Sequence, residues 1–145
     1  MMKQLLPIFL LVLSLFNVNA QSDASSKIKA SADAWINKYA TQFTVYKDTV
    51  VTLDSTESAE VIFDFTKSVD YKLGVVLSGE VNATLQVEDG GIGAEVYAAG
   101  VKDALGNTIA ESMLNIQDNS PLNIKVITLN AGIGLPCRYI VLKKK

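Results

Sequence analysis

The sequence contains no histidine and a single cysteine, and each shortage excludes a class of chemistry. Without histidine the chain lacks the commonest general base and a common metal ligand near neutral pH. With Cys137 alone, no disulfide can form within the chain, so a hydrophobic core must hold the fold together. The alternation of apolar residues puts Cys137 on one face with Tyr139 and Val141, which predicts a buried, unreactive thiol; a reactive thiol and a bridge between chains are the alternatives.

Clustered positive charge is also missing. The chain has 13 Lys and Arg residues against 15 Asp and Glu, and without residues 1–20, which contain only Lys3, 12 basic residues face the same 15 acidic ones. Binding to a phosphate backbone needs a clustered basic face, so we expect no nucleic-acid partner. The triplet Lys143, Lys144 and Lys145 is interpreted as a solubilising tail.

The sequence lacks an apolar run long enough to span a membrane. Residues 5–16 are almost wholly apolar, but these twelve residues, interrupted by Ser14, fall short of the ~20 that a spanning helix needs. The basic start at Lys3 and the short apolar stretch are instead typical of a secretory signal peptide, cleaved between Ala20 and Gln21. We expect a secreted protein, or a periplasmic one in a Gram-negative cell, with no membrane association after cleavage; an uncleaved membrane anchor is the alternative.

Apolar residues recur at helical spacing between residues 21 and 43. The steps between Ile28, Ala32, Trp35, Tyr39 and Phe43 are four, three, four and four residues, which predicts one amphipathic helix with a single apolar stripe. Trp35 and Tyr39 are expected to pack on the rest of the domain. An aromatic stripe open to a membrane or a partner is the alternative, although the polar face is too weakly basic for a membrane-surface helix. The spacing leaves open whether this helix docks or stands apart.

From residue 44 to residue 145 the apolar period changes to two, and β-branched residues become frequent. Tyr71, Leu73 and Val75 share one face, with Lys72 on the other, so each strand is expected to have one solvent-exposed face. Turn residues separate the runs. We predict a mainly β domain, an antiparallel β-sandwich or jelly roll of about eight strands. The expected strands cover residues 44–53, 60–65, 71–77, 81–87, 94–101, 108–116, 122–129 and 137–142.

Carboxylates are the remaining candidates for catalysis. A small hydrolase would need two of them facing one cleft, and the chain offers Asp64, Glu80, Glu88, Asp89 and Glu95. A solvated strand face explains these residues more simply, so we expect no enzyme activity. Residues 90–93, Gly-Gly-Ile-Gly, lack the following helix of a phosphate-binding loop, and they predict a hairpin connection.

No cofactor motif is present, and calcium is the metal that fits best, because it takes hard oxygen ligands and its extracellular sites can be weak. Glu88, Asp89 and Asp103 stand at loop edges without the spacing of a calcium-binding loop. Residues 103–107, Asp-Ala-Leu-Gly-Asn, have the pattern of a β-turn whose polar side chains bind their own backbone. We expect no cofactor, with calcium as a minor alternative.

Several stretches from residue 60 onward resemble the pre-peptidase C-terminal domains, small β-sandwiches appended to secreted bacterial hydrolases. The resemblance lies in the tyrosine-led strand at residues 71–77, the strand at 83–87, the turn at 103–107 and the closing strand at 137–142. It covers somewhat over half of the chain after residue 20. It implies a β-sandwich fold and transfers no functional residue.

The domain at residues 44–145, preceded by the helix at 21–43, is therefore interpreted as a secreted, non-catalytic module that recognises a protein or an extracellular glycan. Trp35 and Tyr97 are the candidate binding residues, because aromatic side chains give contact area at low entropic cost. A structural or self-assembling protein, joined through edge strands or through Cys137, is the alternative function, and a small carboxylate-dependent hydrolase is the third. The oligomeric state is not predicted.

Overall fold

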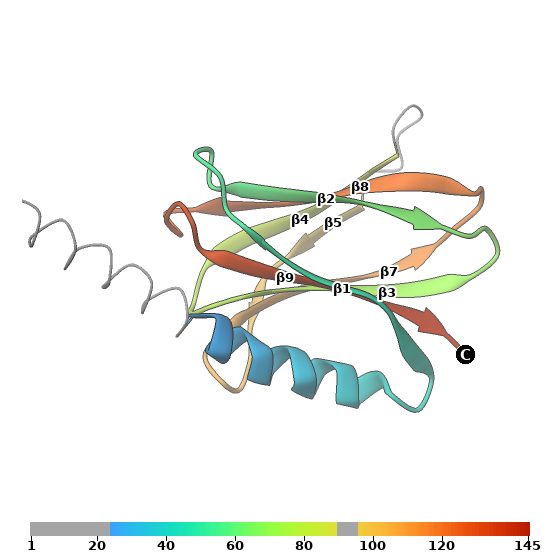
Figure 1. The fold of residues 1–145 in the computed structure, drawn as a ribbon, viewed down its shortest axis with the longest axis horizontal. Coiled ribbons are helices and arrows are strands. Elements are labelled where there is room, and N and C mark those ends of the chain that lie inside the picture. The colour runs from blue at the N-terminus through green and yellow to red at the C-terminus, as the bar shows by residue number, and fades with distance from the viewer. Residues whose placement is uncertain (1–23, 90–95) are drawn as a thin grey trace, which may run out of the picture.

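Two antiparallel β-sheets pack face to face, and a helix covers the outer face of one of them (Figure 1). The computed structural model of the protein describes residues 24–89 and 96–145, and the helix covers residues 24–39. The described strands are β1 (Phe43–Thr52), β2 (Ser58–Phe65), β3 (Asp70–Leu77), β4 (Asn82–Asp89), β5 (Val96–Ala99), β6 (Val101–Lys102), β7 (Thr108–Asn115), β8 (Ser120–Leu129) and β9 (Pro136–Lys144). The five-stranded sheet has the order β1-β9-β3-β7-β6, and the four-stranded sheet has the order β2-β8-β4-β5.

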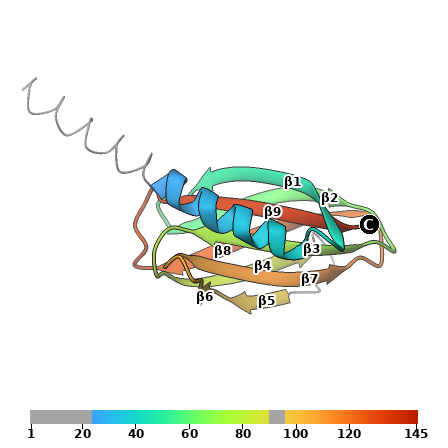
Figure 2. The same ribbon diagram turned by 90° about the horizontal axis from the view of Figure 1, so that it is seen from below.

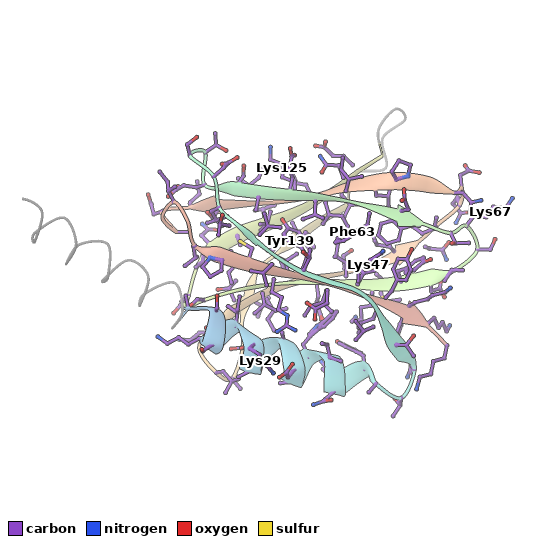
Figure 3. The ribbon with its side chains drawn as sticks, in the orientation of Figure 1. Lys29, Lys47, Phe63, Lys67, Lys125 and Tyr139 are labelled. Atoms are coloured by element: carbon purple, nitrogen blue, oxygen red, sulfur yellow. The ribbon has the colours of Figure 1, made fainter. Side chains whose placement is uncertain are left out.

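Alternating residues of the strands build the core between the sheets. Tyr71 and Leu73 of β3 point inward and are fully buried, as their period-two spacing predicts. Figure 3 shows Phe63 and Tyr139 between the sheets and Lys125 on the outer surface. The predicted mainly β, antiparallel sandwich is therefore confirmed.

Tyr139 of β9 links the two sheets by hydrogen bonds through the core. Its hydroxyl donates to the carbonyl of Ala59 on β2 at 2.6 Å and accepts from the amide of Val126 on β8 at 3.2 Å. Burial raises the pKa of this phenol well above its ordinary range. The core thus contains a polar side chain whose hydrogen bonds are satisfied, which sets the position of one sheet against the other.

The single thiol lies in the same core. Cys137 is buried and has no disulfide partner. Burial raises its pKa to about 12, because a thiolate would lose its hydration there. The structure therefore confirms the predicted buried thiol.

The outer face of the five-stranded sheet is not uniformly exposed to solvent. Val76 of β3 and both Ile140 and Leu142 of β9 point away from the core, yet they are at most 1% exposed, because the helix covers them. The expectation that each strand has one solvent-exposed face is wrong for these two strands. The helix, whose docking the sequence left open, packs on the sandwich.

The helix ends earlier than its apolar spacing suggests. Helical structure stops at residue 39, and the amides of Ala40 and Gln42 bind the carbonyls of Asn37 and Tyr39, three residues back, which tightens the last turn. Phe43 continues the apolar stripe in space, but it does so as the first residue of β1, buried in the same cluster.

The terminal lysines belong to the fold. Lys143 and Lys144 lie in β9, and the amide of Lys145 donates to the carbonyl of Gln42 at 3.0 Å. The ammonium group of Lys145 donates to the carbonyl of Ala40 at 2.8 Å. The last residue therefore binds the turn that follows the helix, where a positive charge also interacts favourably with the helix dipole.

The strand expected at residues 94–101 divides at Gly100. Its first part, β5, is an edge of the four-stranded sheet, and β6 is an edge of the five-stranded sheet. The amide of Gly100 donates to the carbonyl of Ala83 at 2.9 Å, and a Cβ atom on Gly100 would lie only 2.5 Å from Cγ2 of Thr108. The chain thus changes sheets at a residue without a side chain, and the expected number of about eight strands becomes nine among the described residues.

Some predictions concern residues that the structure does not describe. The signal peptide at residues 1–20, its cleavage between Ala20 and Gln21 and the hairpin connection at residues 90–93 lie outside the described residues. Within residues 24–89 and 96–145, no helix is both long and apolar enough to cross a membrane.

Candidate binding groove

Trp35 attaches the helix to the five-stranded sheet. It is 5% exposed and lies in a cluster with Ile28, Ala32 and Ile140. Its six-membered ring lies against the backbone of Gly74, where an added Cβ atom would come within 2.8 Å of Cζ2. Glycine at this place in β3 therefore makes room for the indole, and most of the Trp35 surface serves the packing of the helix.

The carboxylate of Glu111 on β7 accepts hydrogen bonds from the two aromatic side chains of the helix, Trp35 and Tyr39. The indole N–H of Trp35 donates to Oε2 of Glu111 at 2.5 Å, and the hydroxyl of Tyr39 donates to the same oxygen at 3.2 Å. The ammonium group of Lys72 lies 4.0 Å from this oxygen and 4.3 Å from the centroid of the Tyr39 ring. Glu111 is therefore held by two hydrogen-bond donors and a nearby positive charge.

A second polar contact fixes the N-terminal half of the helix to the turn between β6 and β7. Asn107 is 4% exposed, and its amide nitrogen donates to Oγ of Ser31 at 2.7 Å and to the carbonyl of Lys27 at 3.2 Å. Its amide oxygen accepts from the backbone N–H of Gly79 at 3.0 Å. One buried side chain thus joins the helix, the turn after β3 and the turn before β7.

Between these two contacts a groove runs along the helix. It consists of two adjoining hollows of about 340 and 330 Å³, and both are lined by Trp35, Lys38, Asp103 and Ile109. The first hollow continues over Ala99, Val101, Lys102 and Glu111, and the second continues over Ser31, Ala34, Ala104 and Leu105. In Figure 2 the helix lies over β9 and β3, beside β7 and β6, whose residues line the groove together with those of the helix. Both hollows are broadly open to solvent, and their volumes lie at the lower end of the range for ligand sites, which begins at about 300 Å³.

The groove combines an open aliphatic surface with charges at its sides. Val101 is 68% exposed and Leu105 is 58% exposed. Ile109, which is opposite Val101 in the strand pairing, lines both hollows and packs against the cluster under the helix. Asp103 directs Oδ1 to the amides of Leu105 and Asn107, at 2.9 and 2.8 Å. This is the self-binding turn that the sequence predicts at residues 103–107.

The carboxylates considered for catalysis lie elsewhere. Asp64 is on β2, Glu80 follows β3, and Glu88 is on β4, so these three stand on separate elements and do not line the two hollows. The side chains of Asp89 and Glu95 are outside the described set. No group of three or more Cys, Asp or Glu side chains in the described part of the chain could hold a metal ion.

The two predicted binding residues have different places in the structure. Trp35 lines both hollows with the small part of its surface that packing leaves free. Tyr97 lies on β5, opposite Gln86 of β4, and its side chain is outside the described set. Ala99, two residues after Tyr97, lines the first hollow. The structure therefore places Trp35 at the groove and leaves the role of Tyr97 as a prediction.

Sequence reasoning missed the rest of the groove, because its two sides are about seventy residues apart in the chain. The available signal was Leu105, an aliphatic residue at the centre of the turn 103–107, where a polar residue would be expected. The sequence around Val101 did not indicate an exposed binding residue, since an apolar residue at the end of a strand is normally predicted to be buried in the core.

Solved structures resemble this chain at low sequence identity and with TM-scores below 0.5. The pre-peptidase C-terminal domain of a collagenase from Bacillus anthracis is 12% identical, with a TM-score of 0.47 over 66% of this chain and 87% of that chain. PliG from Aeromonas hydrophila, a periplasmic lysozyme inhibitor, is 16% identical, with a TM-score of 0.39 over 70% and 86%. A family 35 carbohydrate binding module from Clostridium thermocellum is 12% identical, with a TM-score of 0.39 over 69% and 90%.

The resemblance to pre-peptidase C-terminal domains is thus one of fold alone, and no ligand follows from it. No family model matches the sequence, and no curated protein matches it significantly.

Proposed function

We propose that this protein is a non-catalytic recognition domain that binds a segment of a partner protein in the groove between the helix and the β6–β7 hairpin. The observation that carries the proposal is the exposed aliphatic surface of Val101 and Leu105 beside a wall fixed by Trp35 and Asn107. A rigid groove binds at a lower entropic cost than one that must form on binding.

A protein segment suits this groove better than a glycan does. Sugars stack on an open aromatic face, but Trp35 is 5% exposed and its N–H is bound to Glu111. The open surface is aliphatic, so the apolar side chains of a peptide can be buried against it. The glycan that the sequence also suggested is therefore the less favoured ligand at this site.

The arrangement of the groove carboxylates supports a binding role over a catalytic one. Glu111 already accepts hydrogen bonds from Trp35 and Tyr39, and Asp103 accepts them from its own turn. A general acid or base must instead reach a proton on a bound substrate. Both carboxylates act here as structural acceptors.

The place of action in this proposal is outside the cytoplasm, on the grounds of the signal-like residues 1–20. The mass of the protein recovered from the medium or periplasm of its own cell tests this. A mass that begins at Gln21 agrees with the proposal, and a mass that includes residues 1–20 contradicts it.

Self-assembly through sheet edges receives less support. The long edge strand β1 has exposed Val45 and Val50, yet its pairing with β9 is interrupted between Val45 and Lys47. Such an irregularity and a charged residue such as Lys47 are features that discourage edge-to-edge pairing. Size-exclusion chromatography at rising concentration tests this alternative, which predicts a growing assembly where the recognition domain predicts a constant size.

Selection from a displayed peptide library, followed by affinity measurement, tests the recognition function. Peptides selected on the wild type are expected to lose about tenfold or more in affinity for a Val101→Ser, Leu105→Ser variant, since each exposed aliphatic contact contributes on the order of 1 kcal/mol. The matched control is Ile62→Ser on β2, because Ile62 is 69% exposed and belongs to the other sheet. Failure to select any peptide, or equal losses in the groove and control variants, would contradict the proposal, and selective binding of glycans in the groove would replace it.

A further inference from the structure

We infer that the partner segment carries an aliphatic side chain flanked by carboxylates. The inference rests on the proposed function of the groove and adds the charge of its ligand. It follows from which charged groups of the groove are already engaged within the protein and which remain open to a ligand.

The carboxylates that line the groove, Glu111 and Asp103, already accept hydrogen bonds from within the protein. Glu111 accepts from Trp35 and Tyr39 and lies 4.0 Å from the ammonium group of Lys72. Asp103 binds two amides of its own turn through Oδ1. The hydroxyl of Ser31 accepts from Asn107. A ligand therefore meets few polar groups at the helix side of the groove that still need a partner.

The positive charges of the groove stand at its sides and are more available. Lys38 of the helix and Lys102 of β6 line the same hollow and come from different elements. The ammonium group of Lys38 is 5.0 Å from the centroid of the Tyr39 ring, and it interacts with the Tyr39 side chain and with the charge of Glu111. Lys38 is exposed and an ammonium group has three donors, so donors remain for a ligand.

Lys102 has a protein partner that a ligand can replace. Its ammonium group lies 3.2 Å from Oε2 of Glu80, but the side chains are 57% and 75% exposed, and exposed ion pairs of this kind contribute little. A carboxylate held in the groove by neighbouring apolar contacts would compete with Glu80 for Lys102.

The groove thus combines an aliphatic surface, formed by Val101, Leu105 and Ile109, with a cation from the helix and a cation from the hairpin. An aliphatic residue seated on this surface places its flanking residues toward Lys38 and Lys102. Charge complementarity then favours acidic flanking residues and disfavours basic ones. The protein as a whole is acidic, with 15 acidic against 13 basic residues, so this preference is a local property of the groove.

The fluorescence of Trp35 measures peptide binding, because Trp35 is the single tryptophan of the chain and lines both hollows. Three peptides without aromatic residues, Ac-Xaa-Xaa-Leu-Val-Leu-Xaa-Xaa-NH2 with Xaa as Asp, Asn or Lys, are titrated into the full domain, with calorimetry as an independent readout. We expect the acidic peptide to bind most tightly and the basic one least, with affinities that differ on the order of tenfold. Higher salt should reduce the difference.

A matched pair of double variants separates a local effect from that of total charge. In the Lys38→Glu, Lys102→Glu variant the order of the three peptides should reverse. The control, Lys67→Glu, Lys125→Glu, has the same net charge and changes lysines away from the helix (Figure 3). Its order of affinities should stay that of the wild type.

The other outcomes contradict either the charge inference or the proposed function of the groove. If the three peptides bind equally, the charge inference fails and the proposed function stands. If none of them binds and library selection also yields no ligand, the proposed function fails. If the control variant reverses the order as strongly as the groove variant does, total charge is the cause and the inference fails.

Discussion

Replacing Gly74 by alanine tests how the helix is seated on the five-stranded sheet. A Cβ atom at this position would lie 2.8 Å from Cζ2 and 2.9 Å from Cη2 of Trp35. Ordinary contacts of this type begin at 3.4 Å, so the indole ring would have to move by about 0.6 Å, the difference between 3.4 and 2.8 Å. Because Trp35 is also bound to Glu111, this movement disturbs the packing of the ring and its hydrogen bond together.

Two opposing effects decide the magnitude. Overpacking in a well-packed cluster costs about 1 to 3 kcal/mol. Alanine also restricts the unfolded chain more than glycine does, which stabilises the native state by about 0.4 to 1 kcal/mol where the backbone permits it. We therefore expect Gly74→Ala to lower the free energy of unfolding by about 1 to 2 kcal/mol, because steric conflict outweighs the entropic gain.

Urea unfolding of the Gly74→Ala variant, followed by circular dichroism, gives the free energy, and Trp35 fluorescence reports whether the ring has moved. The matched background is Trp35→Leu, which removes the atoms that Cβ would meet. Gly74→Ala should then cost less than in the wild type, and the difference measures the coupling of the two residues. An equal cost in both backgrounds, or an unchanged stability in the wild type, would refute the steric argument.

Three further perturbations test the buried groups. Asn107→Ala should lower the free energy of unfolding by about 1 to 3 kcal/mol, because Asn107 is 4% exposed and its removal leaves buried partners such as Ser31 unbonded. A urea denaturation curve that gives the same free energy of unfolding as the wild type would contradict this. Tyr139→Phe should cost about 2 kcal/mol, since two hydrogen bonds of about 1 kcal/mol each are lost, and it should do so without changing Trp35 fluorescence in the native state. Cys137 should resist iodoacetamide at pH 8 in the native protein and react once urea unfolds it, and rapid native alkylation would count against its burial.

The same thiol predicts a dependence of stability on pH. The pKa of Cys137 is raised by burial from 9.0 to about 12. Below pH 9 both states keep the proton, and between pH 9 and 12 the unfolded state loses it first, so the free energy of unfolding should fall as pH rises, by about 1.4 kcal/mol per pH unit at most. Tyr139 acts in the same direction at higher pH. Thermal melts from pH 8 to pH 11 measure the decline, and a Cys137→Ala variant with an equally steep decline would show that the thiol is not its source.

The fold could be predicted wherever burial follows the local period. Tyr71 and Leu73 alternate with polar residues, and because the two faces of a strand meet different surroundings, that alternation carries the information. The division at Gly100 could not be predicted, since one glycine within an apolar run is compatible with an uninterrupted strand. The side chain of Thr108 occupies the space where a Cβ atom on residue 100 would lie, and this contact cannot be read from the pattern of the strand itself.

The candidate site was only partly predictable for a related reason. Trp35 stood out by residue type and helical position, and its packing on the sheet follows from the apolar stripe. Asn107 looks like an ordinary turn residue, and nothing nearby in the sequence indicates that it binds Ser31, 76 residues away. Lys38 and Lys102 are single charges in separate segments, and they line one hollow because the helix packs on the sheet that has β6 at its edge (Figure 2).

The position of β9 has a consequence for how the chain reaches its native state. Among the described strands, β1 is paired within its sheet to β9 alone, so that Phe43 is opposite Lys144, and β9 also separates β1 from β3. The seat of the helix includes Ile140 and Leu142 of the same strand. A nascent chain that has emerged only as far as residue 135 therefore has neither a complete five-stranded sheet nor the complete surface on which its helix docks. Folding has to wait until nearly all of these residues have been synthesised, and such long-range closure favours slow, all-or-none folding over stepwise formation from the N-terminus.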